Sequence, residues 1–338
     1  MSNCLIVFSN ISRLLPLKGV HSKILFLVED LKRILAIGDL NVDIIVSGMS
    51  EFPELGREIH CRDVRTVMGG SASIFACRLS QLGVKVDILG VVGRDDNGKI
   101  VLNTLRSNNV GIDKVIIRDD IRTGVTVSLT YPNDKALITF TGSIGALEPS
   151  DVPAELLRDY DHVHISSIYF QPKLLGHIAE IFKEAKRQGL TTSLDTQDDP
   201  SGRYEKIWKM LEHTDIFLPN DKEAREIAKT TSLDEALMKI GFKAETLTVK
   251  CGGRGAVGKM GDKIVKVKPL KINPVDTTGA GDSFDAGFLY YFLCKGMSFE
   301  DSLRFANAMG ALSCLYIGGT GGRITEKDVL RFMHEKRS

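Results

Sequence analysis

The stretch Val275-Asp276-Thr277-Thr278-Gly279-Ala280-Gly281-Asp282-Ser283-Phe284 decides the fold and the chemistry expected of this 338-residue chain. It follows an apolar and basic pattern over 263–271 that predicts a strand, and it opens a pattern that predicts a helix to about Leu293. The glycines on either side of Ala280 allow a tight turn that exposes backbone N–H groups. Such groups favour an anion at a helix N-terminus. Asp282 places a carboxylate beside that anion, as phosphoryl transfer to a hydroxyl requires.

The overall composition sets the class of protein. The 44 basic and 43 acidic side chains leave a net charge of +1, which does not indicate a nucleic-acid partner. No apolar run is long enough to span a membrane. The cysteines are scattered without a C-x-x-C pair, which fits reduced thiols and predicts a cytoplasmic protein; they are Cys4, Cys61, Cys77, Cys251, Cys294 and Cys314.

The chain reads as an N-terminal extension followed by one domain. Residues 1–33 lack early positive charge and a clear cleavage site, so we favour a non-core extension over a signal peptide. From residue 34 to 338, strand patterns alternate with helix patterns and predict an α/β domain with a mostly parallel sheet. Residues 44–68 and 123–141 instead read as a small antiparallel sheet, a discontinuous β-lid.

A polar cluster directly follows the first predicted strand. Asn41 and Asp43 stand there, and ligands of parallel α/β sheets bind beyond the carboxyl ends of strands. An Asx-type turn explains the same residues equally well. Gly69 and Gly70 introduce the next predicted helix.

Three other patterns are rejected as functional sites. The run Gly93–Ile100 approaches a P-loop but has Ile100 where the metal-binding hydroxyl belongs. The G-x-G-x-x-G from Gly253 leads into a hairpin pattern, not the helix of a dinucleotide site. His162 and His164 share one strand face without a third metal ligand nearby and are expected to be packed.

The residues of the opening stretch closely resemble the D-T-x-G-A-G-D segment of the ribokinase-like, PfkB-type carbohydrate kinases. The resemblance runs from about Arg33 onward. It implies a three-layer α/β/α ribokinase-like fold and transfer of the γ-phosphoryl of ATP to a hydroxyl of a small carbohydrate. In this reading Asp282 is the catalytic base, and Gly279, Ala280 and Gly281 form the anion hole. An Asp that merely caps a helix is the alternative.

The resemblance also assigns the acceptor side. It implies that Asp43 binds sugar hydroxyls with help from Asn41, and that Gly69 and Gly70 belong to the substrate site. One departure stands out, because Ile74 replaces the substrate-contacting Asn of the family's G-G-x-x-x-N motif. Ser166, Tyr169 and Phe170 are further candidates for the pocket wall. Some family members dimerise through the lid, so a homodimer is an option here.

On the nucleotide side, the resemblance implies an ATP site built from five positions: Asn220, Lys250, Gly252, Gly255 and Asn307. Glu223 would hold Mg²⁺ through water, and Asp195 would lie near the phosphates or their metal. Asn220 with Glu223 also fits a plain capping box. Lys250 stands where many members have Thr, and it either neutralises phosphate charge or lies in solvent.

A monovalent cation is a further implication of the resemblance. In many members, carbonyl groups near the anion hole bind K⁺, and the matching positions here are Asp276, Thr278, Ser313 and Gly318.

Two alternatives to a sugar kinase stay open. A nucleoside kinase would share the fold, and Ile74 makes the acceptor pocket less typical of sugar kinases. A non-catalytic sugar- or nucleotide-sensing protein is the second alternative, although it would have no use for a base beside an anion hole.

Overall fold

Buried apolar strands form the centre of the structure, a computed structural model that describes residues 33–131 and 135–336. An eight-stranded sheet has the order β14-β13-β12-β11-β10-β9-β1-β4. The strands from β12 to β4 pair in parallel, whereas β13 and β14 form an antiparallel hairpin at one edge. The strands are β1 (Ile34–Ile37), β4 (Val86–Leu89), β9 (His162–Ile165), β10 (Thr191–Leu194), β11 (Ile216–Phe217), β12 (Thr246–Lys250), β13 (Ala256–Met260) and β14 (Lys263–Val267).

Helices cover both faces of this sheet, and β1 shows why. Its four residues are fully buried, with Ile34 and Ala36 in one apolar cluster and Leu35 and Ile37 in another. The first cluster joins α1 (Ser71–Gln81), α2 (Asp96–Ser107), α9 (Ala280–Leu289), α10 (Phe299–Ser313) and α11 (Glu326–Glu335) to the sheet. The second joins α3 (Ala154–Leu157), α4 (Pro172–Leu175), α5 (Ile178–Arg187), α6 (Ile207–Leu211), α7 (Asp221–Ala228) and α8 (Leu233–Ile240).

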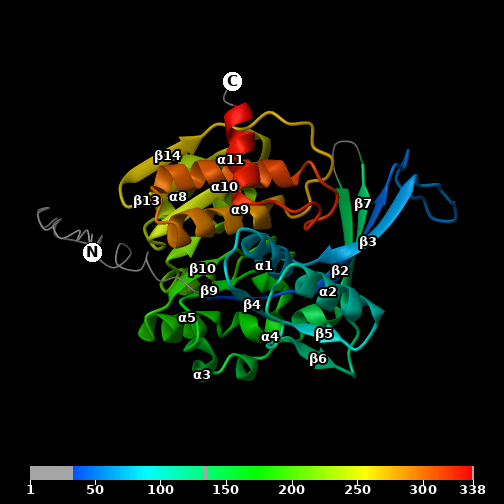
Figure 1. Ribbon diagram of the computed structural model, residues 1–338, viewed down its shortest axis with the longest axis horizontal. Helices are drawn as coiled ribbons and strands as arrows, with labels where there is room; N and C mark the ends of the chain where they lie inside the picture. The colour runs from blue at the N-terminus through cyan, green and yellow to red at the C-terminus, as the bar shows by residue number, and fades with distance from the viewer. Residues whose placement is uncertain (1–32, 132–134, 337–338) are drawn as a thin grey trace, which may run out of the picture.

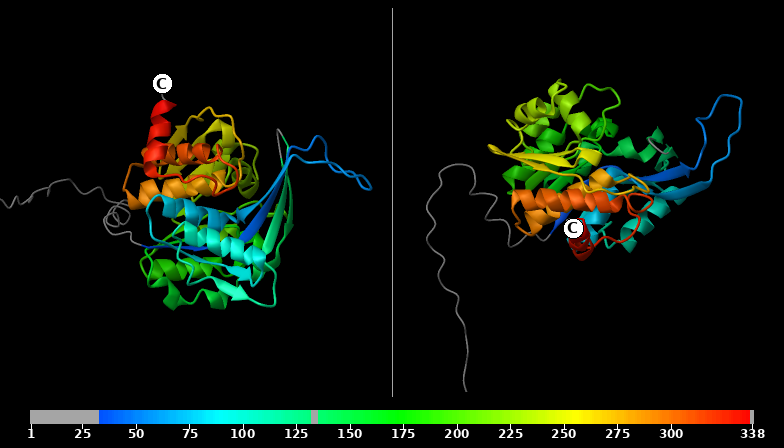
Figure 2. Two further views of the ribbon diagram at one scale, coloured as in Figure 1. Left: turned by 45° about the vertical axis from the view of Figure 1, so that its right-hand side comes forward. Right: turned by 90° about the horizontal axis from the view of Figure 1, so that it is seen from above.

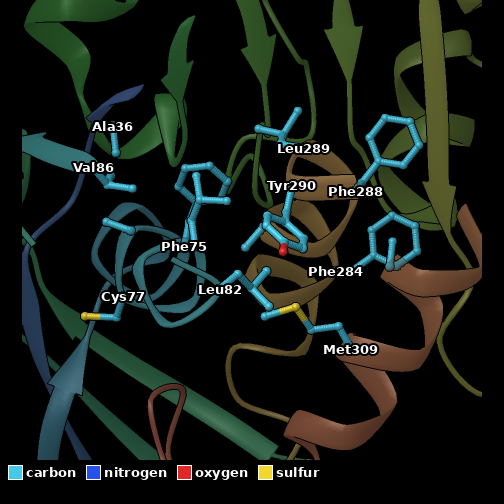
Figure 3. Close-up of a cluster of buried hydrophobic side chains, with 14 of the residues drawn as sticks. Ala36, Phe75, Cys77, Leu82, Val86, Phe284, Phe288, Leu289, Tyr290 and Met309 are labelled. Atoms are coloured by element: carbon cyan, nitrogen blue, oxygen red, sulfur yellow. The ribbon is translucent and has the colours of Figure 1, made fainter. Parts of the chain in front are cut away.

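These two helix layers lie on opposite sides of the strands when the molecule is seen from above (Figure 2). Within the first layer, Phe75 and Cys77 of α1 share one buried cluster with Phe284 and Phe288 of α9 (Figure 3). The predicted three-layer α/β/α architecture is therefore confirmed.

A second sheet, here called the lid sheet, stands to one side of this body (Figure 1). Its strands are β2 (Asn41–Ser47), β3 (Asp63–Gly69), β7 (Gly124–Thr130) and β8 (Lys135–Phe140), in the order β3-β2-β7-β8. Only Gly38, Asp39 and Leu40 separate β1 from β2, so the chain passes almost directly from the central sheet into the lid sheet. Asn41 and Asp43 consequently lie on a lid strand and not in a turn.

Two predicted elements differ in detail. The strand expected over 86–92 is interrupted at Gly90, where a Cβ would lie 2.7 Å from the carbonyl oxygen of Gly38. A short β5 (Val91–Gly93) follows and pairs with β6 (Ile116–Arg118) in a separate sheet. The strand expected over 263–271 ends at Val267, and a loop that contains Pro269 and Pro274, which lack an N–H donor, leads to α9.

The remaining sequence expectations concern the N-terminus and membranes. The N-terminal extension expected over residues 1–33 lies almost entirely outside the described residues, which begin at Arg33. Within the described ranges, no helix is both long and apolar enough to cross a membrane.

Candidate active site

A cavity of about 190 Å³ opens between the lid sheet and the carboxyl ends of the central strands. It is lined by residues from the lid sheet, from the loops that follow β1, β9 and β10, and from the first turns of α1 and α9. Among the residues predicted for the site, Asn41, Asp43, Gly70, Thr278, Gly279 and Asp282 are in its wall. The acceptor-side residues and the predicted base, far apart in the sequence, therefore face one space.

Asp282 lies in the first turn of α9 with only 5% of its surface exposed. Burial raises the pKa of its carboxyl group to about 7, and the negative charge of Asp195 adds to this effect. A hydrogen bond from Ser71 Oγ to Asp282 Oδ1, at 2.5 Å, acts in the opposite direction. A carboxyl group with a pKa near neutrality is well matched to proton transfer at neutral pH.

The backbone in front of Asp282 requires a glycine. Gly279 is the N-cap of α9 and has a φ of 74°, a left-handed conformation that side chains rarely adopt. A Cβ at this position would also lie 2.6 Å from the Cα of Gly319. The N-terminal end of α9, with the partial positive charge of its dipole, thereby lies beside the predicted base.

At the acceptor end, Asn41 orients Asp43. The Nδ2 of Asn41 donates to Oδ1 of Asp43 at 2.9 Å. Burial raises the pKa of Asp43 to about 6, and the hydrogen bond from Asn41 partly offsets this. A Cβ on Gly69 would lie 2.1 Å from the same carboxylate, so Gly69 makes room for Asp43, whereas Gly70 lines the cavity.

Ile74 also lines the cavity, and only 3% of its surface is exposed. Its side chain packs against two glycines. A Cβ on Gly279 would lie 2.9 Å from the Ile74 side chain, and a Cβ on Gly319 would lie 2.2 Å from it. Phe170 lines the cavity as expected. Ser166 and Tyr169 are not among the lining residues, and the Tyr169 hydroxyl instead donates to the carbonyl of Glu205 at 3.4 Å.

Behind the predicted anion hole, Lys250 forms a buried ion cluster. Its Nζ lies 3.1 Å from Asp195 and 2.9 Å from Asp285, whose side chains are 3% and 1% exposed. Burial alone would lower the pKa of Lys250, but these two carboxylates raise it above its ordinary value. A Cβ on Gly281 would lie 3.5 Å from the ammonium group. The expectation that Lys250 could lie in solvent is therefore wrong, because paired acids hold it in the interior.

Asn220 and Glu223 form a complete capping box at the start of α7. The Glu223 backbone N–H donates to Asn220 Oδ1, and the Asn220 N–H donates back to Glu223, both at 2.9 Å. Glu223 is nevertheless buried with a pKa raised to about 7, first by burial and then by the charge of Asp195. The capping role explains the local geometry. It does not explain why the carboxyl groups of Glu223 and Asp195 are buried close together.

The oxygen atoms of Glu223 and Asp195 suit Mg²⁺, which prefers carboxylates and retained waters. A divalent cation near these groups would offset the repulsion that raises the pKa of Glu223. The residues therefore fit the expected metal. Among the described residues, no group of three or more His, Cys, Asp or Glu side chains is placed to hold a metal ion by itself. His162 and His164 therefore belong to no such group.

The other predicted ATP residues lie beside β12. Gly252 and Gly255 form the turn from β12 to β13, and the φ of 91° at Gly255 explains the glycine there. Asn220 forms an isolated parallel bridge with Lys250 at the strand end. On α10, Asn307 donates from Nδ2 to the carbonyl of Lys268 at 3.1 Å. These positions remain predictions for nucleotide contacts.

The positions expected for a monovalent cation lie around Asp276. One of its oxygens accepts the N–H of Thr278 at 2.9 Å, and the other accepts the N–H of Gly318 at 2.8 Å. Ser313 is buried on α10, where its hydroxyl donates to the carbonyl of Gly310 at 2.8 Å. Asp276 thus ties the two predicted segments together, and K⁺ binding remains a prediction.

The glycine-rich turn that begins at Gly318 is fastened by a buried arginine. Arg78 of α1 is fully buried and donates to the carbonyls of Gly319, Gly321 and Gly322 at 3.0, 2.9 and 2.8 Å. Burial lowers the pKa of Arg78 to about 10. This turn packs behind Gly279, so α1 supports the predicted anion hole from a second direction.

Sequence reasoning missed three residues of this site: Asp39, Ser71 and Asp285. Asp285 follows Asp282 by three positions, which places both carboxylates on one side of α9. Ser71 directly follows Gly70, yet a single serine at a helix start is too common to indicate a site.

Solved structures show the same fold. A ribokinase from Arabidopsis thaliana, solved in complex with ribose and ATP, superposes with a TM-score of 0.75 at 24% identity, over 89% of this chain and 98% of that one. The fold is thus that of ribokinase-like proteins.

The chain belongs to the pfkB family of carbohydrate kinases, whose family model matches residues 31–326. An uncharacterised sugar kinase from Archaeoglobus fulgidus is 32% identical over 69% of this chain and 92% of its own length. An ATP-dependent ribose-1-phosphate kinase from Halopiger xanaduensis is 31% identical over 90% of this chain and 99% of its own length. The predicted family and the predicted kinase class are confirmed.

Proposed function

We propose that this chain transfers the γ-phosphoryl group of ATP to a hydroxyl of a small carbohydrate. The observation that carries the proposal is the shared cavity, in which Asp282 and the N-terminus of α9 face Asn41 and Asp43. A base beside an anion site, opposite a pair that binds hydroxyls, brings together the groups that this reaction needs.

In this proposal Asp43 and Asn41 orient the acceptor, and Asp282 takes the proton from the reacting hydroxyl. The Gly279–Gly281 backbone stabilises the negative charge of the transferring group. Glu223 and Asp195 would hold Mg²⁺, which neutralises phosphate charge when it is bound. Asn220, Lys250, Gly252, Gly255 and Asn307 are the proposed nucleotide positions. Asp276, Thr278, Ser313 and Gly318 would surround K⁺.

The acceptor is expected to be a small molecule recognised through its hydroxyl groups. Burial of Asp43 supports selectivity, because an acceptor without the matching hydroxyl would leave a buried polar group unpaired. The related ribose-1-phosphate kinase and ribokinase make a pentose or pentose phosphate the first acceptors to test.

A nucleoside kinase is the second candidate, and Ile74 favours it. Its apolar side chain lines the cavity where the family motif has a hydrogen-bonding Asn, and an apolar wall suits a nucleobase better than a sugar hydroxyl.

The decisive experiment measures ADP release from Mg-ATP with a panel of pentoses, hexoses, sugar acids, sugar phosphates and nucleosides. Turnover with a carbohydrate supports the proposal, and turnover with nucleosides alone would select the second candidate. ATP binding without ADP release for any acceptor would contradict both and favour a sensing protein. Sedimentation of the pure protein would show separately whether the chain forms a homodimer.

A further inference from the structure

A hydrogen-bonded chain links Asp282 to the first turn of α1. Ser71 Oγ donates to Oδ1 of Asp282 at 2.5 Å, and the Ser71 backbone N–H donates to Oδ2 of Asp39 at 3.0 Å. The other oxygen of Asp39 accepts the N–H of Ala72, also at 3.0 Å. The side chains of Asp39, Ser71 and Asp282 all line the cavity and are all buried.

We propose that Ser71, anchored by Asp39, is a positioning residue that aims the Asp282 carboxylate at the acceptor hydroxyl. The inference rests on the proposed function, in which Asp282 is the base. Ser71 engages Oδ1 and thereby fixes the rotation of the carboxylate, so that Oδ2 is the oxygen that receives the acceptor proton. Proton transfer depends on such alignment as well as on pKa.

The elements that carry this chain are held firmly against each other. Phe75 of α1 and Phe284 of α9 belong to one buried cluster (Figure 3), and Ile74 packs against Gly279. Asp39 follows β1 and accepts two N–H groups at the start of α1, where a negative charge also suits the helix dipole. The backbone of Ser71 is therefore held beside Asp282, within reach of its hydroxyl group.

The contact also balances the charges around the base. Burial and the carboxylates of Asp195, after β10, and Asp39, after β1, raise the pKa of Asp282. Lys250, at the end of β12, lowers it through charge, and Ser71 lowers it through the hydrogen bond. A hydroxyl that donates to a carboxylate stabilises its ionised form. Ser71 thus keeps the base ionised at a pH where burial would favour its protonation.

A role for Ser71 in capping its own helix agrees less well with the observed hydrogen bonds. Gly70 is the N-cap of α1 and makes no side-chain capping bond, and the Ser71 hydroxyl reaches across to α9 instead of its own helix. Ser73, two residues further on, does make a local bond, to the carbonyl of Gly70 at 3.0 Å.

The kinetic test compares Ser71→Ala, Ser71→Thr and a matched control, Ser283→Ala. Ser283 is fully buried next to the base, and its hydroxyl has no hydrogen-bond partner within the described part of the chain. We expect Ser71→Ala to lower kcat roughly tenfold and to move the acidic limb of the pH profile up by about one unit, since the bond it removes is charge-assisted. The KM for ATP should stay unchanged. Ser71→Thr should keep kcat and the acidic limb at their parent values, and Ser283→Ala should change neither kcat nor the limb.

A second measurement needs no turnover. The difference in unfolding temperature between the parent and its Asp282→Asn variant, followed across pH, reports the titration of Asp282. Ser71→Ala should raise the midpoint of this titration by about one pH unit. A midpoint that Ser71→Ala leaves in place overturns the inference, whether or not the chain phosphorylates any acceptor. An equal loss of kcat in Ser71→Ala and Ser283→Ala, with no shift of the limb, also overturns it. Absence of turnover in the parent protein would instead contradict the proposed function.

Discussion

The two ends of the cavity, which the proposed function assigns to the phosphate and to the acceptor, are built in different ways. At the phosphate end, the N-terminus of α9 and the ends of β10 and β12 belong to one packed body, where paired charges such as Lys250 with Asp285 are buried. At the acceptor end, Asn41 and Asp43 lie on a strand of the lid sheet and face the body across the cavity. The phosphate end is therefore fixed by the fold, whereas the acceptor end depends on which side chains the lid sheet presents.

This difference implies separate consequences of mutation. Changes at the phosphate end should reduce phosphoryl transfer to every acceptor or destabilise the body. Changes at the acceptor end should alter the choice of acceptor and leave ATP use intact.

The largest effect is expected from Asp282→Asn. Loss of the base should lower kcat by about 10²–10⁴-fold, the usual contribution of general-base catalysis. The KM for ATP should change little, because asparagine has nearly the same shape. The unfolding temperature should match that of the parent at low pH and exceed it at neutral pH, because asparagine avoids a buried charge. Steady-state kinetics and thermal unfolding check both points. A variant that retains most of its kcat would remove Asp282 from the mechanism.

Lys250→Met should have the next largest effect, and on stability as well as activity. It leaves the Asp195 and Asp285 carboxylates buried without their counter-charge, a change that typically costs about 3–5 kcal/mol. Urea unfolding measures the loss.

Lys266→Met is the matched control, because the pair of Lys266 with Asp234 is exposed and such pairs contribute about 0–1 kcal/mol. The double variant Lys250→Met/Asp285→Asn should recover part of the stability. Equal stability of Lys250→Met and Lys266→Met would show that the buried cluster does not hold the phosphate end together.

The pH dependence of kcat should reveal the ionised base. The pKa of Asp282 is raised to about 7, and only its carboxylate form accepts a proton, so activity should rise with pH through this region. Below it, the ionised fraction falls about tenfold per pH unit. The residual rate of Asp282→Asn should lack this dependence, and a wild-type profile that is flat from pH 5 to 8 would contradict the assignment.

The smallest effect is expected at the acceptor end, from Ile74→Asn. This change restores the hydrogen-bonding residue of the family motif, and it should shift preference toward sugars by about tenfold, the scale of one hydrogen bond. Ratios of kcat/KM for a pentose and a nucleoside measure the shift, and the KM for ATP serves as the internal control. An equal change for both acceptors would show that Ile74 does not select between them.

The phosphate end was also the more predictable end. Gly279 to Asp282 are recognisable because a tight turn, an anion site and a base require particular residues at fixed spacing. The parallel sheet followed from its alternating strand and helix patterns. Lys250 shows the limit of prediction from sequence. Its ion pair with Asp285 could not be predicted, because β12 and α9 come together only in the folded chain.

The residues that line the acceptor end could not be predicted from the sequence in the same way. Which residues line the cavity depends on the register of the lid strands, where a shift by one residue exchanges the two faces. The roles of Ser71 and Asp39 likewise depend on packing between α1 and α9, which are about two hundred residues apart in the sequence. Gly69 was assigned to the substrate site, but in the structure it makes room for Asp43.

The fastening of Arg78 to the glycine-rich turn has a consequence for the order of synthesis. On the ribosome, α1 emerges long before Gly319, Gly321 and Gly322, which later accept its hydrogen bonds. Until those carbonyls arrive, the guanidinium cannot be buried without a large cost in free energy. The nascent chain therefore completes the face behind Gly279 only after this turn has emerged, and it cannot assemble the cavity wall described above before then.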